Sequence, residues 1–203
     1  MDNLSLILAS SSPRRQELLS LLDISLRIVP SDVEESFLKG ELPEEYVRRL
    51  AITKAQQVAE KFPEFWVLAA DTIVVIEGEV LGKPKDTEEA ESMLEKLSGR
   101  EHQVITGYCL LHSHLGQKRE RIVSSLVKFK RLSAEEIRWY INTGEPFDKA
   151  GGYAVQGKAA FMIKEIKGSY TNVVGLPLCE VIEDLQELGV INFTNGTKNS
   201  PLL

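Results

Sequence analysis

The feature that most constrains the fold is an apolar, largely β-branched segment, residues 65–84, that is interrupted by one charged side chain. Apolar runs on either side of Asp71-Thr72 predict buried strands, and the pattern would place another valine or isoleucine where Asp71 stands. An unpaired carboxylate in apolar surroundings costs several kcal/mol. We therefore expect Asp71 to meet a metal, a cation or a hydrogen-bonding neighbour.

A glycine turn at Gly78 leads to a short second strand that ends at Gly82-Lys83-Pro84. Lys83 then lies just beyond this strand, where it could face the same site as Asp71. One carboxylate and one lysine at the ends of adjacent strands indicate a site for a metal and a phosphate. A core aspartate that caps a turn, beside a solvated lysine, explains this segment equally well.

The N-terminal segment predicts an anion site. Residues 4–9 indicate a buried strand, and Ser10-Ser11-Ser12 leads into a helix that begins at Pro13, with Ser12 as its N-cap. Arg14 and Arg15 lie in the first turn, where positive charge opposes the helix dipole. We therefore favour phosphate binding over ordinary capping with solvent-exposed arginines.

Two further segments carry candidate site residues. The acidic cluster 31–35 ends in Glu35, and the residues alone favour a solvated loop over a magnesium ligand. In the helix predicted over 43–61, Lys54 shares a face with the apolar residues Leu50 and Val58. We expect Lys54 to point inward.

The stretch 148–157 is the second unusual part of the chain. Gly151 and Gly152 precede a predicted short strand, and paired glycines permit close backbone approach to a ligand. Gln156 can donate and accept hydrogen bonds at once, which suits a nucleobase edge. A glycine-rich turn into an edge strand is an equally good interpretation.

The remaining pattern predicts helices over 86–99, 133–144 and 177–188, strands over 24–30 and 160–166, a loop over 168–172, and a hairpin whose strands span 102–112 and 121–132. His102, His112 and His114 lack the spacing of a metal site and are expected at the surface. Strands alternate with helices, which indicates an α/β layered fold with a mixed sheet. We expect one domain over 1–191, with two lobes around a cleft, and a flexible tail over 192–203.

Charge and composition narrow the partners. The net charge of −6 opposes a nucleic-acid partner, and the absence of a run of about 18 apolar residues opposes a membrane span. Two cysteines are too few for a disulfide framework and fit a reducing compartment. We expect a cytoplasmic protein, and a homodimer is left open.

Taken together, several motifs resemble the Maf family, also called septum formation inhibitor proteins: residues 8–15 (LASSSPRR), 70–72 (ADT), 82–84 (GKP), 97–100 (LSGR), 148–153 (DKAGGY) and 172–177 (NVVGLP). The resemblance runs from about residue 4 to residue 188. It implies an elongated α/β fold, with a central mixed sheet flanked by helices, similar to inosine triphosphatases. It also implies a nucleoside triphosphate pyrophosphatase, which splits the bond between the α and β phosphates.

The resemblance also assigns roles. The motif aspartate falls on Asp71, as general base and metal ligand, and Glu35 falls on a second metal ligand for Mg²⁺ or Mn²⁺. The family lysines fall on Lys54 and Lys83. The resemblance also implies that Ser10 is the phosphate-binding serine and that Arg15 is the second arginine of the motif. Hydrolysis at phosphorus needs an activated water, a bridging cation and fixed positive charge, which these residues would supply.

Three positions distinguish two branches of the family. Arg14, Thr72 and Gln156 match the branch that acts on dTTP and UTP, whereas the sister branch, which favours 7-methyl-GTP, has tryptophan, glutamine and glutamate there. A neutral amide can pair with a uracil-type ring, and a glutamate can accept from guanine. The alternative class is a nucleotide-binding regulator of cell division, with the nucleotide as a signal; an intact general base opposes that alternative.

Overall fold

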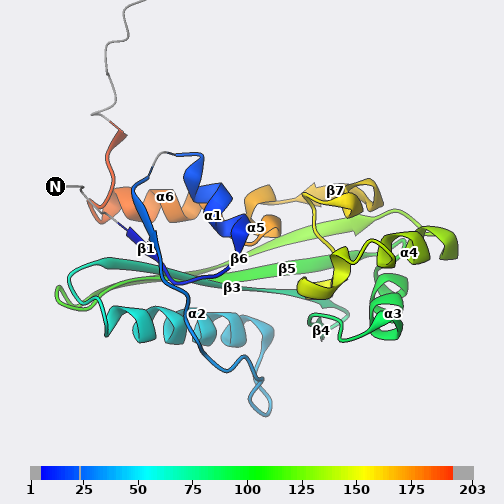
Figure 1. Ribbon diagram of the computed structural model, residues 1–203, viewed down its shortest axis with the longest axis horizontal. Helices are drawn as coiled ribbons and strands as arrows, with labels where there is room; N and C mark the ends of the chain where they lie inside the picture. Colours follow the sequence, from blue (N-terminus) through cyan, green and yellow to red (C-terminus); the bar gives the residue numbers. More distant parts are fainter. Residues whose placement is uncertain (1–5, 23, 194–203) are drawn as a thin grey trace, which may run out of the picture.

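The computed structural model describes residues 6–22 and 24–193 and shows an elongated molecule built on one mixed, seven-stranded sheet (Figure 1). The strand order is β2-β1-β3-β5-β6-β7, and β4 pairs with β3 outside this path. The strands are β1 Leu6–Leu8, β2 Leu26–Ile28, β3 Trp66–Ile76, β4 Glu79–Leu81, β5 Glu101–His112, β6 Gln117–Phe129 and β7 Ile163–Lys167.

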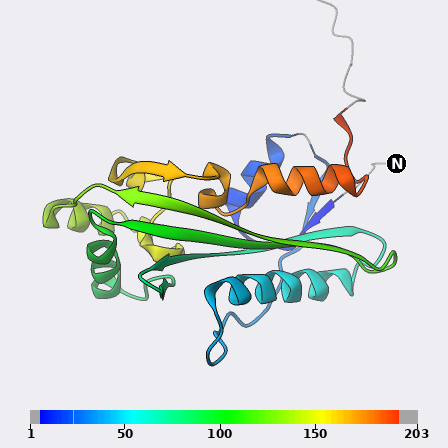
Figure 2. The same cartoon turned by 180° about the vertical axis from the view of Figure 1, so that it is seen from behind.

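Helices cover both faces of this sheet. One face carries the long helix α2 (Pro43–Ala59), and the opposite face carries α1 (Pro13–Ser20), α5 (Tyr170–Val174) and α6 (Leu178–Glu187) (Figures 1 and 2). The helices α3 (Thr87–Leu97) and α4 (Ala134–Ile141) pack at the other end of the molecule. Short 3-10 segments span Glu145–Asp148, Ala150–Gly152 and Lys158–Met162. The predicted α/β fold with a helix-flanked mixed sheet is confirmed.

The strand β3 turns its side chains alternately to the two helical layers. Val67 and Ile73 pack with α2 residues, whereas Leu68 belongs to the core formed with α1 and α6. Because successive side chains of a strand point to opposite faces, Asp71 faces α2 and Thr72 faces the opposite layer. Two neighbouring polar residues therefore enter separate environments.

One edge of β3 is interrupted in the middle. β5 pairs along Val67–Val75, so β1 and β4 must share the other edge: β1 pairs with residues 66–68 and β4 with residues 74–76. β1 is parallel to β3 and β4 is antiparallel, so both strands run toward the gap and end there. The chain leaves the sheet on one side through Ser10 and on the other through Lys83. The predicted positions of Ser10 and Lys83 beside Asp71 follow from this convergence.

Close packing of α2 on the sheet also depends on a glycine. Gly107 of β5 lies opposite Asp71 in the register, and a Cβ atom there would stand 2.7 Å from the backbone carbonyl of Val47 in α2. Any side chain at this position would push α2 away from β3. Because Gly107 has no side chain, α2 lies close enough to the sheet for Lys54 to reach Asp71.

Most predicted helices are confirmed, with ends shifted by a few residues. Lys54 is buried on the apolar face of α2, as expected. Asp86 accepts a hydrogen bond from the Glu89 N–H at the start of α3, and Ser133 forms a capping box with Glu136 at the start of α4. The predicted hairpin is β5 and β6, but β6 begins at Gln117 rather than at residue 121.

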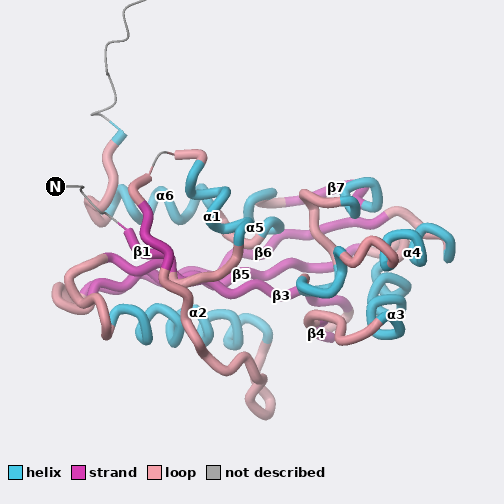
Figure 3. The backbone as a smooth tube through the Cα atoms, viewed as in Figure 1, coloured by secondary structure: helices cyan, strands magenta, loops and turns pink. Residues whose placement is uncertain are grey.

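Several predicted boundaries are wrong. The two strands expected around Asp71 are one continuous strand, because Lys54 pairs with the carboxylate and no break is needed. The residues 153–157 form a turn rather than a strand, and β7 covers only the end of the strand predicted over 160–166 (Figure 3). The loop predicted over 168–172 contains the start of α5, whose N-cap Ser169 accepts from the Asn172 N–H.

The surface prediction for the histidines holds only for His114, which is exposed. His102 and His112 are buried. His102 packs edge-on against Phe129 and Tyr153, and its Nε2 lies 2.7 Å from the Tyr153 hydroxyl oxygen. A histidine can thus serve as a core aromatic residue when one of its two ring nitrogens has a hydrogen-bond partner, here Nε2, while Nδ1 has none among the described residues.

Single-domain organisation over residues 1–191, with two lobes, stays a prediction. The tail predicted to be flexible over 192–203 lies, from residue 194 onward, outside the described residues. None of the helices in the described ranges is long and apolar enough to span a bilayer.

Burial of His102 predicts a pH-dependent stability. Burial lowers the pKa of His102 to about 4, below its ordinary 6.5. The unfolded chain therefore takes up a proton first, and the free energy of unfolding should fall as the pH drops from 6.5 toward 4, by on the order of 3 kcal/mol. His102→Gln, which keeps a polar group for Tyr153, should flatten this slope in denaturant titrations. His114→Gln is the exposed control; equal slopes in both variants would contradict the assignment.

Candidate active site

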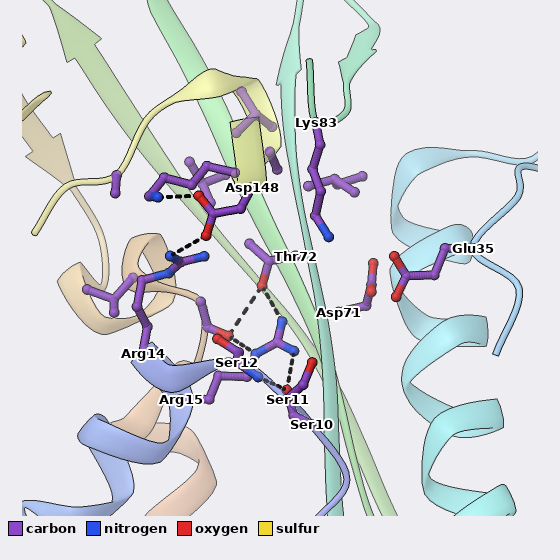
Figure 4. A pocket seen from close by; sticks show the side chains of 18 of the residues that line it. Ser10, Ser11, Ser12, Arg14, Arg15, Glu35, Asp71, Thr72, Lys83 and Asp148 are labelled. Carbon is purple, nitrogen blue, oxygen red and sulfur yellow. Dashed lines mark hydrogen bonds and ion pairs between the residues drawn. The ribbon is translucent and has the colours of Figure 1, made fainter. Parts of the chain in front are cut away.

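A pocket with a cavity volume of about 520 Å³ lies at the open edge of β3 (Figure 4). Its wall is formed by the serine run with the start of α1, by the middle of β3, by the Glu35 loop with α2, and by residues 148–150, 153–155 and 173–175. The gap in the sheet gives it access to both faces of β3. All the predicted site residues except Gln156 line it: Ser10, Arg14, Arg15, Glu35, Lys54, Asp71, Thr72 and Lys83.

On the α2 side, Lys54 joins two carboxylates. The Lys54 ammonium donates to Asp71 Oδ1 and to Glu35 Oε1, both at 2.6 Å. Lys54 and Asp71 are buried, whereas the Glu35 side chain is about half exposed, at 48%. Asp71 thus has the partner that its place in an apolar strand demands.

The pKa values of the two carboxyl groups are shifted in opposite directions. Burial raises the pKa of Asp71 above its ordinary value, although Lys54 and Arg15 oppose the shift. Burial also resists ionisation of Glu35, but the hydrogen bond and charge of Lys54, together with Lys83 and Arg15, bring its pKa below the ordinary value. Environments that separate two carboxyl pKa values assign a proton acceptor and a permanent anion. Here Asp71 fits the first role and Glu35 the second.

The loop that carries Glu35 is tied to α2. The Tyr46 hydroxyl donates to the Glu35 carbonyl oxygen at 3.2 Å, and the Tyr46 ring stacks on Phe37. Burial raises the pKa of Tyr46 to about 12, so this hydroxyl keeps its proton. Gln57 accepts from the Asp32 N–H and donates to the Asp32 carbonyl. The segment predicted as a solvated loop is indeed a loop, and these contacts direct Glu35 to Lys54.

On the opposite face, Arg15 links three segments. Its Nε donates to the Gly175 carbonyl at 2.7 Å, Nη1 donates to Ser10 Oγ at 3.3 Å, and Nη2 donates to Thr72 Oγ1 at 3.1 Å. Burial lowers the pKa of Arg15, but a guanidinium stays protonated in proteins. Since these partners are neutral, Arg15 brings an uncancelled positive charge to the pocket wall.

Two more cations border the pocket. Arg14 makes a long ion pair of 3.8 Å with Asp148 across the pocket. Lys83 is exposed and has no ion-pair partner among the described residues, and its side chain points into the pocket between Asp71 and Thr72 (Figure 4). Ser12 stands at the N-cap of α1 without a side-chain capping bond. Arg14, Arg15 and Lys83 together favour a ligand with several negative charges.

Gln156 is the predicted site residue that does not line the pocket. Its side chain is exposed and does not line the pocket, although its neighbours Ala154 and Val155 do. Its role in base recognition stays a prediction.

The residue pattern assigned no role to several pocket residues, among them Tyr46, Asp148 and Gly175. Tyr46 was predicted only as an apolar position of α2, and Asp148 and Gly175 stood within motifs without a function. Asp148 had a usable signal, since it begins the stretch 148–157 whose paired glycines, Gly151 and Gly152, predicted a close approach to a ligand. Nothing local could have revealed Gly175, because its carbonyl becomes important through Arg15, 160 positions earlier in the chain.

The donor set suits a hard divalent cation. Among the described residues no group of three or more His, Cys, Asp or Glu side chains is placed to hold a metal. Glu35 and Asp71 nevertheless lie close enough to share Lys54, and Mg²⁺ commonly takes one or two carboxylates together with waters and substrate phosphates. Two carboxylates at a polyanion pocket fit that mode.

Comparison with known proteins assigns the chain to a family. The family model described as "Maf-like protein" matches residues 5–188. The chain belongs to the Maf family. The resemblance of its motifs is thereby confirmed.

Curated members of the Maf family are similar over nearly the whole chain. The chain is 52% identical to a dTTP/UTP pyrophosphatase of Syntrophus aciditrophicus, with 93% of this chain and 92% of that protein covered. It is 54% identical to the enzyme of the same name from Geotalea uraniireducens, covering 92% and 96%, and 49% identical to that of Myxococcus xanthus, covering 93% and 95%.

Removing Lys54 should expose the energetic importance of its pairing. Lys54→Met leaves Asp71 buried without a cation and should lower the free energy of unfolding at pH 7 by about 3–5 kcal/mol. Adding Asp71→Asn to this variant should restore part of the loss, since the unpaired charge is gone. Lys96→Met is a matched control: Lys96 lies 2.6 Å from Glu79, but both side chains are solvent-exposed, so about 1 kcal/mol or less is expected. Similar losses for the two lysines in denaturant titrations would refute the argument.

Proposed function

We propose that this Maf-family chain is a nucleoside triphosphate pyrophosphatase that hydrolyses dTTP and UTP to the nucleoside monophosphate and pyrophosphate. Relatives about 50% identical over most of the chain are named dTTP/UTP pyrophosphatase, which supports the substrate and the reaction. The pocket supports the same chemistry through its charges and its shape. Its volume is within the roughly 300–1,000 Å³ of small-molecule sites.

One observation carries the proposal: at the open edge of β3, a buried carboxylate from one face of the sheet and a guanidinium from the other face border the same pocket. Asp71, with a raised pKa, stands on the α2 face, and Arg15, with an uncancelled charge, stands on the other face beside Thr72. A proton acceptor and fixed cations can thus approach one phosphate group from two sides.

The reaction balances with these residues. Asp71 accepts a proton from a water whose oxygen attacks the α phosphorus, a bond forms between that oxygen and phosphorus, and the bond from the α phosphorus to the bridging oxygen breaks. Pyrophosphate leaves with the electron pair of the broken bond. Arg15, Arg14 and Lys83 hold the phosphates and stabilise the negative charge that develops on their oxygens.

Glu35 and Asp71 would hold a divalent cation, Mg²⁺ or Mn²⁺, which would neutralise phosphate charge when bound. Lys54 fixes the direction of both carboxylates through its two hydrogen bonds of 2.6 Å. Lys54 also opposes the effect of burial on the pKa of Asp71, because the Lys54 charge favours the carboxylate form.

For base choice, we propose that Arg14, Thr72 and Gln156 favour a pyrimidine. Thr72 acts through Arg15, since its Oγ1 accepts from Arg15 and hydrogen bonds to the Thr106 hydroxyl. Gln156 directly follows the pocket residues Ala154 and Val155 in the chain, which places it at the border of the pocket. Cytoplasmic location, a homodimer and a link to septum formation stay predictions.

The decisive experiment is a panel of all common nucleoside triphosphates and 7-methyl-GTP, with phosphate release measured in the presence of added inorganic pyrophosphatase. We expect dTTP and UTP to be turned over best. Omitting the added pyrophosphatase should remove the signal, because the direct product is pyrophosphate. Tight binding without turnover would favour the regulatory alternative, and preference for 7-methyl-GTP would place the chain in the sister branch.

Asp71→Asn should remove the proton acceptor. We expect kcat for dTTP to fall by about 100-fold to 10,000-fold. In the wild type, kcat/KM should decline toward acid pH with a midpoint above the ordinary aspartate pKa of 3.8, because burial raises the pKa of Asp71 and protonation abolishes its basicity. The variant should lose this acid limb. The exposed Glu88→Gln serves as control; if Asp71→Asn retains full turnover and Glu35→Gln does not, the two roles are reversed.

Chelation should stop the reaction. With excess EDTA we expect dTTP turnover to fall to background, and added Mg²⁺ or Mn²⁺ should restore it, since both are bound by carboxylate oxygens. Glu35→Gln should require a higher metal concentration for half-maximal rate. Full turnover in excess chelator would exclude the metal requirement.

Gln156→Glu should weaken dTTP binding. The carbonyl groups of thymine repel a carboxylate, and a polar group that a bound base covers without a hydrogen-bond partner costs about 1–3 kcal/mol, so kcat/KM for dTTP should fall by roughly tenfold to over a hundredfold. CTP should be a poor wild-type substrate because its donor and acceptor pattern is reversed. Gln103→Glu, at an exposed position of β5, is the control. An unchanged substrate ranking in the Gln156 variant would mean that base choice lies elsewhere.

A further inference from the structure

A tight turn forms one wall of the pocket and carries Gln156. The Gly157 N–H donates to the Ala154 carbonyl at 3.1 Å, which closes the turn. Ala154 and Val155 line the pocket, and Gln156 follows them on the exposed side. The position of this turn therefore determines the shape of this pocket wall and the place of the Gln156 amide beside it.

Both ends of the turn are held by a pair of residues outside the pocket, Tyr140 and Glu145. The Tyr140 hydroxyl, at the end of α4, donates to Glu145 Oε1 at 3.0 Å, and the backbone of Ala154 lies beside this hydroxyl. The Lys158 N–H donates to Glu145 Oε2 at 3.0 Å. One end of the turn thus donates a backbone hydrogen bond to the Glu145 carboxylate, and the other end lies against the Tyr140 hydroxyl bonded to that carboxylate.

Gly157 leaves the space that this contact needs. A Cβ atom at this position would overlap the Glu145 carboxylate. The backbone there is extended, with a φ of −102°, so its conformation does not demand glycine. Glycine is required at this position because the Glu145 carboxylate lies so close to it.

Glu145 itself is fixed by its neighbours. Its N–H donates to Thr143 Oγ1 at 3.3 Å, and its carbonyl accepts from the Lys149 ammonium at 2.9 Å. Tyr140 is fully buried, and burial, followed by the charge of Glu145, raises its pKa. Its hydroxyl consequently stays a donor to Glu145 throughout the neutral range.

We propose that Glu145, held by Tyr140, is a positioning residue for nucleobase selection, because it fixes the turn 154–158 that walls the pocket. This inference rests on the proposed function, which assigns base contact to the same turn. Glu145 does not line the pocket. Its side chain bonds to Tyr140 and to the backbone of this turn, and to none of the phosphate-binding cations or the two paired carboxylates. Loss of Glu145 should therefore disturb the base end of a nucleotide and leave the phosphate end intact.

The test compares a ligand that has a base with one that lacks it. For each variant, KM for dTTP, the ratio of kcat/KM for dTTP to that for CTP, and the inhibition constant of inorganic pyrophosphate are measured by chromatographic detection of the nucleoside monophosphate. Melting temperatures report folding. The variants are Glu145→Ala, Tyr140→Phe and Gly157→Ala, with Glu145→Gln as the conservative change and Glu135→Ala, at an exposed position of α4, as the control.

We expect Glu145→Ala to raise KM for dTTP about tenfold and to reduce the dTTP-to-CTP ratio by a similar factor, since misplaced binding groups have effects of this size or larger. The inhibition constant of pyrophosphate should change less than twofold. Tyr140→Phe and Gly157→Ala should act in the same direction, and combining Tyr140→Phe with Glu145→Ala should add little, because both break one unit. Glu145→Gln, which can still accept from the Lys158 N–H, should retain most of the selectivity.

Two results would overturn the inference. Equal factors for dTTP and pyrophosphate would show a general disturbance of the pocket, and unchanged values for both in well-folded Glu145→Ala and Tyr140→Phe would show that the pair does not position the turn. Failure of the wild type to turn over dTTP or UTP is a different outcome, which would count against the proposed function and not against the geometry of the turn.

Discussion

The pairing of the Lys54 ammonium with Asp71 and Glu35 is the interaction on which the rest of the site depends. It allows a carboxylate to stand in the middle of an 11-residue buried strand. It also demands that α2 approach the sheet closely, which Gly107 permits, and that the loop before α2 bend back toward the helix, where Tyr46 and Gln57 hold it. A charge inside a core thus determines the packing of a helix, a strand and a loop.

On the other face of β3, the partly buried charge of Arg15 is held by neutral hydrogen-bond acceptors instead of carboxylates. Its guanidinium is surrounded by the Gly175 carbonyl and by two hydroxyl groups, so its hydrogen bonds are satisfied while its charge is not cancelled. Lys54, by contrast, is largely neutralised. The difference follows from the alternation of Asp71 and Thr72 along one strand. It gives the pocket a side suited to a proton acceptor and a cation, and a side suited to phosphate oxygens.

Local sequence patterns predicted the parts whose causes are local. The apolar spacing of α2 indicated that Lys54 points inward, and the charged interruption of an apolar run indicated that Asp71 needs a partner. The pattern could not show that this partner would let β3 continue unbroken, because the pairing joins residues 17 positions apart. It also placed His102 at the surface, since only the fold brings the Tyr153 hydroxyl to its ring. The sequence predicted a strand where the turn around Gln156 lies. The contacts of this turn with Glu145 and Tyr140 form only in the folded protein and have no signature in the sequence.

The interruption in the pairing of β3 bears on how this strand edge avoids pairing with another chain. An unpaired strand edge is a template for the strand of another molecule, and long exposed edges promote aggregation. Here the unpaired part, residues 69–73, is closed off at both ends by β1 and β4, and residues 71–73 line a concave pocket. A small ligand can enter this recess, whereas an extended polypeptide would collide with the two bordering strands. The arrangement that leaves this strand edge open to a small ligand thus keeps it closed to another β-strand.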